Sequence, residues 1–216
     1  MKDRRLAISV GVSLILMTII AGYVFGYAYP EFYHVDKLEL LKGDILSHQS
    51  LYKSMLVGIV LILILDIIVS YGLYKYFEDD NRKISLAAGI IRVIYTVIFA
   101  IATYYLVINM NATELKNQTI NSNFKQFQTI WNVGLVIFGF HILLIGWLMK
   151  LHQIIPKVIW YLTVFAGVCY LVVHLLKLTI PNSSLATNTE LFLALPMALG
   201  EFGLAIWLLI KGGRKK

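Results

Sequence analysis

Six long apolar segments constrain this chain more than any other feature of its sequence. They cover approximately residues 6–28, 54–77, 84–108, 129–149, 158–179 and 191–211. A helix needs about 20 apolar residues to cross the roughly 30 Å of hydrocarbon in a bilayer, and each segment is that long. Because lipid offers the backbone no hydrogen-bond partners, such segments cross it as helices. We predict an all-α polytopic membrane protein, a six-transmembrane-helix bundle that forms a single integral membrane domain over residues 1–216.

The composition agrees with a membrane protein. Charged residues make up 14% of the chain and hydrophobic residues 59%, whereas a soluble domain carries about 25% charged residues. The formal net charge of +7 does not indicate nucleic-acid binding, because the basic residues cluster at the ends of the apolar segments. The first apolar segment is too long for a secretory signal peptide, so we interpret it as a retained span. The lipid bilayer is therefore the expected partner, and no protein partner follows from the sequence.

The distribution of basic residues predicts the orientation. Of the 19 Lys and Arg residues, 12 fall on the side that holds both termini, 6 fall on the other side, and Arg92 lies within a span. Loops on the cytoplasmic side carry an excess of Lys and Arg. We therefore expect both termini to be cytoplasmic. Small-residue pairs such as Gly22 with Gly26 and Ala194 with Ala198 have the spacing of close helix packing.

Four of the predicted spans carry an ionisable residue well away from their ends, namely Asp66, Arg92, His141 and Glu201. Such residues are costly in hydrocarbon and almost always face the interior of a bundle. At a rise of about 1.5 Å per residue, Arg92 and His141 lie about 12 Å from the cytoplasmic end of their helices. Asp66 and Glu201 lie about 15–16 Å from that end. Four helices therefore bring polar groups to one layer.

The helix face around Glu201 carries small residues, with Ala198 three positions before it and Ala205 four positions after it. Small residues mark the faces that helices turn toward one another, while lipid-facing surfaces carry larger apolar side chains. We therefore predict that Glu201 faces the bundle interior and pairs with Arg92, for which Asp66 competes.

The charges of this layer do not balance. Asp66 and Glu201 against Arg92 alone leave one negative charge in a region of low dielectric constant. A protonated carboxyl, a protonated His141 or a bound cation would compensate it. The layer is therefore either an ion-pair network that only fixes helix packing, or a site for a small ligand, a proton or a cation.

A metal site and a haem site are weaker hypotheses. The first polar loop contains possible metal ligands at Glu31, His34, Asp36, Asp44 and His48. A solvated loop is the favoured interpretation, because no H-E-x-x-H motif or cysteine pair accompanies them, so we expect no metal. A haem held by His141 and His174 is disfavoured because the two lie about 12 Å apart in depth. No cofactor is expected.

The stretches "SLYKSMLVGIVLILILDIIVSYGLYKYF", "AAGIIRVIYTVIFA", "GFHILLIGWLMKLHQIIPKVIWYLTVFAGVCYLV" and "LPMALGEFGLAIWLLIKG" resemble, in that order, a family of bacterial membrane proteins known as domain of unknown function 4386. The resemblance covers nearly the whole chain and is weakest at residues 109–128. It implies a compact multi-span bundle with a mid-span Asp, an Arg, a Gly-x-His and a Gly-Glu, which fall here on Asp66, Arg92, His141 and Glu201. It also implies a multi-pass protein of the bacterial cytoplasmic (inner) membrane, and it implies no reaction.

The leading functional hypothesis is a non-enzymatic membrane protein whose interior polar layer binds a small ligand, proton or cation, as a sensor or small transporter does. One alternative is a membrane-embedded enzyme on lipid-like substrates, with Asp66, His141 and Glu201 as acid–base or metal groups. Another is a structural accessory subunit. The motifs of hydrolases, P-loops and dinucleotide-binding folds are absent.

Overall fold

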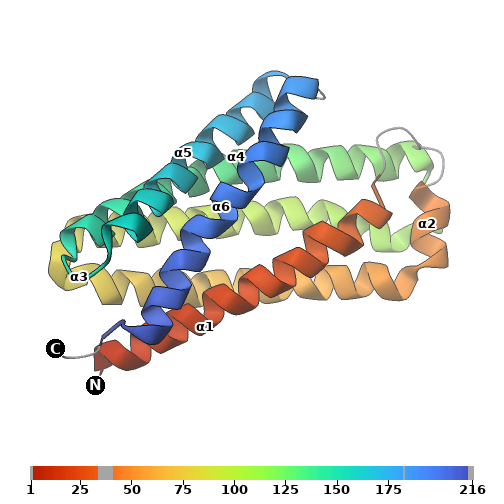
Figure 1. Ribbon diagram of the computed structural model, residues 1–216. Helices are drawn as coiled ribbons and strands as arrows, with labels where there is room; N and C mark the ends of the chain where they lie inside the picture. The colour runs from red at the N-terminus through yellow and green to blue at the C-terminus, as the bar shows by residue number, and fades with distance from the viewer. Residues whose placement is uncertain (1, 34–40, 182, 214–216) are drawn as a thin grey trace.

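The computed structural model describes residues 2–33, 41–181 and 183–213, and every long element in these ranges is an α-helix (Figure 1). The all-α prediction is therefore confirmed for the described residues. Five helices, some with short π or 3-10 extensions, are long and apolar enough to cross a membrane. They are α1 (Lys2–Tyr23) with η1 (Val24–Ala28) and η2 (Tyr29–Glu31), α3 (Gln49–Ile108) with η3 (Asn109–Asn111), α4 (Asn117–Leu151), α5 (Lys157–Thr179) and α6 (Ser184–Ile210). The short helix α2 (Leu41–Ser47) precedes α3.

Helix α3 contains two of the predicted apolar segments, because it folds back on itself at Asn81. The backbone of Asn81 leaves the helical region, with φ −163° and ψ 99°. Its side-chain Oδ1 accepts a hydrogen bond of 3.1 Å from the N–H of Ile84, which is the bond of an N-cap residue. A new helix therefore starts as soon as the previous one ends, and the two arms of α3 are joined by this single non-helical residue.

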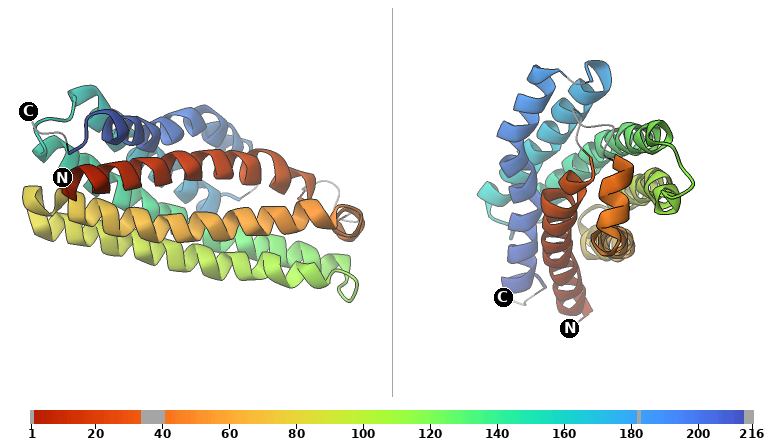
Figure 2. Two further views of the ribbon diagram at one scale, coloured as in Figure 1. Left: turned by 90° about the horizontal axis from the view of Figure 1, so that it is seen from below. Right: turned by 90° about the vertical axis from the view of Figure 1, so that its right-hand side faces the viewer.

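The two arms of α3 run antiparallel and side by side (Figure 2). Ser70 on the first arm donates a hydrogen bond of 2.8 Å to the carbonyl of Gly89 on the second arm. Ser85 on the second arm donates one of 2.7 Å to the carbonyl of Tyr74 on the first. This reversal explains why five long helices hold six predicted apolar segments.

The long helices form a closed ring, in which α1 packs on α3, α3 on α4, α4 on α5, α5 on α6, and α6 on α1. Both termini lie at one end of the bundle (Figure 1), which we call the terminal end. Arg4 of α1 donates hydrogen bonds of 2.9, 2.9 and 2.5 Å to the carbonyls of Leu208, Gly212 and Leu209. A cation at a helix C-terminus satisfies carbonyls that have no partner within the helix. Arg4 thus holds α1 and α6 together at the terminal end, and the two helices diverge toward the opposite end (Figures 1 and 2).

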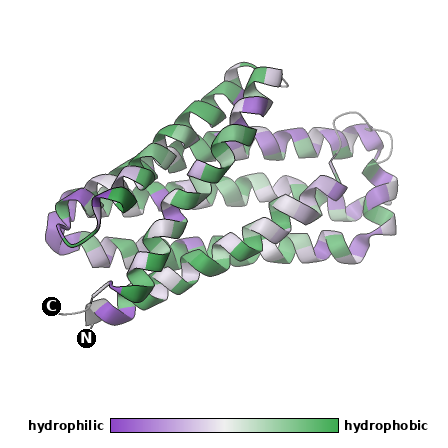
Figure 3. Cartoon of the chain, in the orientation of Figure 1, coloured by the Kyte–Doolittle hydropathy of each residue, from purple (hydrophilic) through white to green (hydrophobic). Residues whose placement is uncertain are grey.

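The core consists of two large apolar clusters with polar residues between them. On the first arm of α3, Ile62 belongs to the cluster on one side and Val69 to the cluster on the terminal side. Asp66 lies between these two positions. Hydrophilic residues gather at the ends of the bundle, while its middle is mostly apolar (Figure 3). Large apolar side chains such as Ile64 and Ile101 are exposed on the outside, as lipid-facing positions require.

The closest helix contacts occur at glycines outside the small-residue pairs singled out in the sequence. A Cβ added at Gly200 would lie 2.4 Å from the Cβ of Ala166, and one added at Gly72 would lie 2.3 Å from a methyl of Val10. Added Cβ atoms at Gly22 and Gly26 would meet nothing within 4 Å. The contact between α5 and α6 therefore depends on a glycine at position 200.

The substitution Gly200→Ala is expected to destabilise the fold by about 1–3 kcal/mol, because the new methyl overlaps a backbone-attached methyl that cannot move aside. Gly22→Ala, the matched control, is expected to leave stability unchanged or to raise it slightly, since alanine favours helices. Reversible unfolding in detergent micelles measures both. Equal stability of the two variants would contradict the packing described for α5 and α6.

Candidate functional site

Arg92 lies at the centre of the polar layer, on the second arm of α3, and its side chain is fully buried. Its Nε donates a hydrogen bond of 2.9 Å to Oδ1 of Asp66 on the first arm. Its Nη2 lies 2.7 Å from the same oxygen. Asp66 is also fully buried. The two arms of α3 are therefore joined by an ion pair that is sealed from solvent.

The remaining contacts of Arg92 reach three other helices, including α1, where Nη2 lies 4.0 Å from Sδ of Met17. Nη1 donates a hydrogen bond of 2.8 Å to Oε1 of Glu201 on α6. Nη1 also lies 3.1 Å from Nε2 of His141 on α4, and the guanidinium carbon lies 5.2 Å from the ring centre of Phe138. The structure thus brings the four predicted residues together around one guanidinium.

His141 is electrically neutral in this arrangement. Its Nδ1 lies 2.9 Å from the backbone carbonyl of Ala88, so Nδ1 carries the proton and donates it to the carbonyl. Arginine nitrogens only donate hydrogen bonds, so Nε2 of His141 accepts from Arg92 and carries no proton. A protonated His141 therefore does not supply the charge that the layer lacks.

The two carboxylates of the layer have different surroundings. The side chain of Asp66 is 0% exposed, whereas that of Glu201 is 22% exposed. Oδ2 of Asp66 is buried without a hydrogen-bond partner among the described residues. Glu201, in contrast, lines a cavity of about 460 Å³. The unbalanced negative charge of the layer is therefore accessible at Glu201.

This cavity, which we call the inner cavity, lies between the diverging helices α1 and α6 and is closed behind by α3, α4 and α5. Its wall includes Gly22 of α1 and Ala198 of α6, so two small residues that the sequence assigned to helix packing instead leave space here. An adjoining outer cavity of about 580 Å³ lies toward the loop between α5 and α6. Both cavities share the lining residues Phe25, Trp131, Leu135, His174 and Glu190.

The outer cavity holds polar residues that the sequence did not assign to a common site. Nζ of Lys177 lies 2.5 Å from Oε1 of Glu190, and Nδ1 of His174 lies 2.8 Å from Oδ1 of Asn132. These pairs join α5 to α6 and α5 to α4. His174 and Lys177 are three residues apart and therefore share a face of α5, but Asn132 and Glu190 are distant in the sequence. His174 is bonded to Asn132, whereas His141 is bonded to Arg92 and to the carbonyl of Ala88.

The weak candidate metal ligands of the first polar loop, where no metal was expected, are described only in part, because His34 and Asp36 lie outside the described residues. Nδ1 of His48 lies 2.9 Å from Oγ of Ser47 and 3.3 Å from the backbone oxygen of Asp44. Within the described ranges, no group of three or more His, Cys, Asp or Glu residues is arranged to hold a metal ion.

The family model described as Domain of unknown function (DUF4386) matches residues 9–212. The chain belongs to this family. A relative, described only as an uncharacterized protein of Archaeoglobus fulgidus, is 29% identical over 157 residues, which cover 73% of this chain and 83% of the relative. No solved structure matches the chain. The region that matches the family model includes all four residues of the polar layer.

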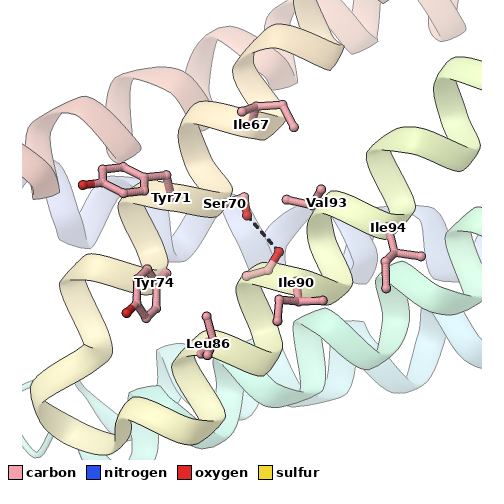
Figure 4. Close-up of a pocket in the computed structure, with 9 residues that line it drawn as sticks. Ile67, Ser70, Tyr71, Tyr74, Leu86, Ile90, Val93 and Ile94 are labelled. Carbon is pink, nitrogen blue, oxygen red and sulfur yellow. Dashed lines mark hydrogen bonds between the residues drawn. The ribbon is translucent and has the colours of Figure 1, made fainter.

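A further cavity in this family member lies on the outer face of the α3 hairpin and has a volume of about 310 Å³ (Figure 4). Its wall is formed by apolar and tyrosine side chains from both arms, together with Gly89 and Ser70. The hydroxyl of Ser70 is already bonded to the carbonyl of Gly89. This groove therefore presents no charged group, in contrast to the inner cavity.

The ion pairs of Arg92 are expected to be strongly coupled to one another. Arg92→Met leaves two carboxylates without a cation and should lower the free energy of unfolding by about 3–5 kcal/mol, as removal of one partner from a buried pair does. The triple variant Asp66→Asn, Arg92→Met, Glu201→Gln should lose less, because it contains no unpaired charge. The free energies of unfolding of the single and the triple variant are measured in mixed micelles and compared. A triple variant less stable than Arg92→Met would show that the charges are not coupled.

Proposed function

We propose that this protein is a six-span protein of the bacterial cytoplasmic membrane, with both termini in the cytoplasm, that binds a proton or a cation at Glu201 as a sensor or small transporter does. The topology is supported by three observations. The two arms of α3 each contain an apolar segment of spanning length, both termini lie at one end of the bundle, and most basic residues fall on the terminal side. Basic residues remain on the cytoplasmic side.

The observation that carries the functional proposal is the exposure of one carboxylate of an unbalanced layer. Asp66 and Arg92 neutralise each other out of contact with solvent. Because Asp66 and Glu201 share the charge of Arg92 and His141 is neutral, one negative charge of the layer is uncompensated, and Glu201 is the carboxylate that faces the inner cavity. A proton or a cation that enters the cavity removes this charge, and its attraction to the carboxylate is stronger in surroundings of low dielectric constant than in water.

The same geometry favours a binding role over a purely structural one for Glu201. A purely structural network would be buried away from solvent, with every polar atom hydrogen-bonded. Asp66 and Arg92 are fully buried, and Oδ2 of Asp66 is the atom of this pair that has no partner among the described residues. Glu201 uses Oε1 for Arg92, and its side chain is partly exposed at the cavity wall. A ligand that pairs with Glu201 also weakens its bond to Arg92, which ties α6 to α3. Binding is thereby connected to helix packing, which is what a sensor or a transporter requires.

Infrared difference spectroscopy of the full-length protein tests this proposal. The wild type is expected to show a protonated-carboxyl band that appears as the pH falls and that an added monovalent cation such as ammonium displaces to lower pH. Glu201→Gln should lack this band. Glu78→Gln, which removes a carboxylate paired with Lys75 outside the cavity, should retain it. The same titrating and cation-sensitive band in Glu201→Gln would refute the proposal.

A further inference from the structure

Aromatic rings line the inner cavity beside the carboxylate of Glu201. Six rings from α1 with its π-helical extension, α3, α4 and α5 form its wall, namely Phe25, Tyr95, Phe99, Trp131, Phe138 and Tyr170. Phe25 belongs to the π-helical turn η1 (Val24–Ala28), and turns of this kind occur frequently at functional sites.

These aromatic rings pack against one another. Phe25 and Trp131 stack with their centres 4.3 Å apart, and Tyr95 and Phe138 lie 4.7 Å apart. Tyr170 meets Phe138 edge-on at 5.1 Å. Because each ring restricts its neighbour, the wall is formed before any ligand arrives, and a ligand does not have to order it.

The charges of the cavity wall select against anions. The residues that line the inner cavity include the acids Glu190 and Glu201 and no Lys or Arg. Glu190 is neutralised by Lys177, so Glu201 carries the charge that a ligand meets. A cation is attracted both by this carboxylate and by the aromatic rings of the wall.

The lining also distinguishes between kinds of cation. Calcium takes about 6–8 oxygen ligands and magnesium keeps several of its waters, and an apolar wall supplies few oxygens. Aromatic faces instead suit organic ammonium groups, whose charge is spread over several carbons and whose hydration is weak.

We propose that the inner cavity binds an organic cation, with one ammonium-type centre beside Glu201 and an apolar or aromatic body against the ring wall. This inference rests on the proposed function, because it names the class of ligand for the positive charge that Glu201 binds. The volume of about 460 Å³ falls within the range of about 300–1,000 Å³ that small-molecule sites occupy.

Binding of benzyltrimethylammonium to the purified full-length protein in detergent micelles tests the inference. Neopentylbenzene has the same shape without the charge, so it measures the contribution of the charge alone. The cation is expected to bind at least about tenfold more tightly than the neutral compound, because only the cation gains from the carboxylate and the ring faces. Equal binding of the two compounds would overturn the inference.

Three variants locate the site. Glu201→Gln keeps an acceptor for Arg92 and should weaken binding of the cation by at least about tenfold. Trp131→Leu should weaken it by about three- to tenfold through loss of a ring face. Glu78→Gln should bind as the wild type does. Circular dichroism and gel filtration confirm that each variant is folded, and unchanged affinity in a folded Glu201→Gln variant would overturn the inference.

The infrared and binding experiments separate the two proposals. A titrating Glu201 band without binding of benzyltrimethylammonium would leave the proposed function standing and refute the organic cation. Absence of the Glu201 band and of benzyltrimethylammonium binding would refute both proposals. Tight binding that depends on Glu201 supports both.

Discussion

A guanidinium buried in the middle of a membrane-spanning bundle must find its counter-charges and hydrogen-bond acceptors on neighbouring helices, and the arrangement of this protein follows from that requirement. Arg92 binds Asp66 on the other arm of α3, His141 on α4 and Glu201 on α6. An unpaired charge there would cost several kcal/mol, on the order of 3–5 kcal/mol once a partner is removed. Three helices are therefore held at one depth by one side chain, between two apolar clusters.

The partners of Arg92 divide into a sealed part and an accessible part. Asp66 and His141 are enclosed by the core, and His141 is fixed as a neutral acceptor by the carbonyl of Ala88. Glu201 stands on α6, the helix that diverges from α1 toward the end opposite the termini. Arg4 closes these two helices at the terminal end, and the residues of α6 that line the inner cavity are Glu201 and residues before it, toward the opposite end. A structural ion pair and an accessible carboxylate thus share one guanidinium.

Much of this layer could be predicted from the sequence, because the rise of an α-helix is fixed and apolar segments have recognisable ends. The depth of each residue along its predicted helix was enough to predict that Asp66, Arg92, His141 and Glu201 lie in one layer. The prediction that Asp66 and Glu201 compete for Arg92 differs from the structure, in which Arg92 binds both. A guanidinium has five N–H donors in a planar fork and can serve two carboxylates at once.

Other features were not predictable, since they depend on contacts between distant parts of the chain. The cavity wall is assembled from five helices, and its volume is set by the divergence of α1 and α6 rather than by any local motif. Gly22 has the spacing of a packing residue, but no helix covers it. The many polar residues at 117–128 led us to predict that the span begins at residue 129, whereas α4 begins at Asn117. The helical stripe of Ile120, Phe124 and Phe127, all buried, was the signal that could have revealed these first turns of α4.

We propose that Glu201 faces a cavity that water reaches from the side opposite the termini. Cysteine labelling in intact cells tests it, in a Cys169→Ala background that removes the buried native thiol. A membrane-impermeant thiol reagent added outside is expected to label Ala198→Cys, which lies on the cavity wall one turn from Glu201. It should not label Ala205→Cys, which is fully buried on the same helix. Equal labelling of the two positions, or labelling of Ala198→Cys only by a lipid-soluble reagent, would contradict an aqueous cavity at Glu201.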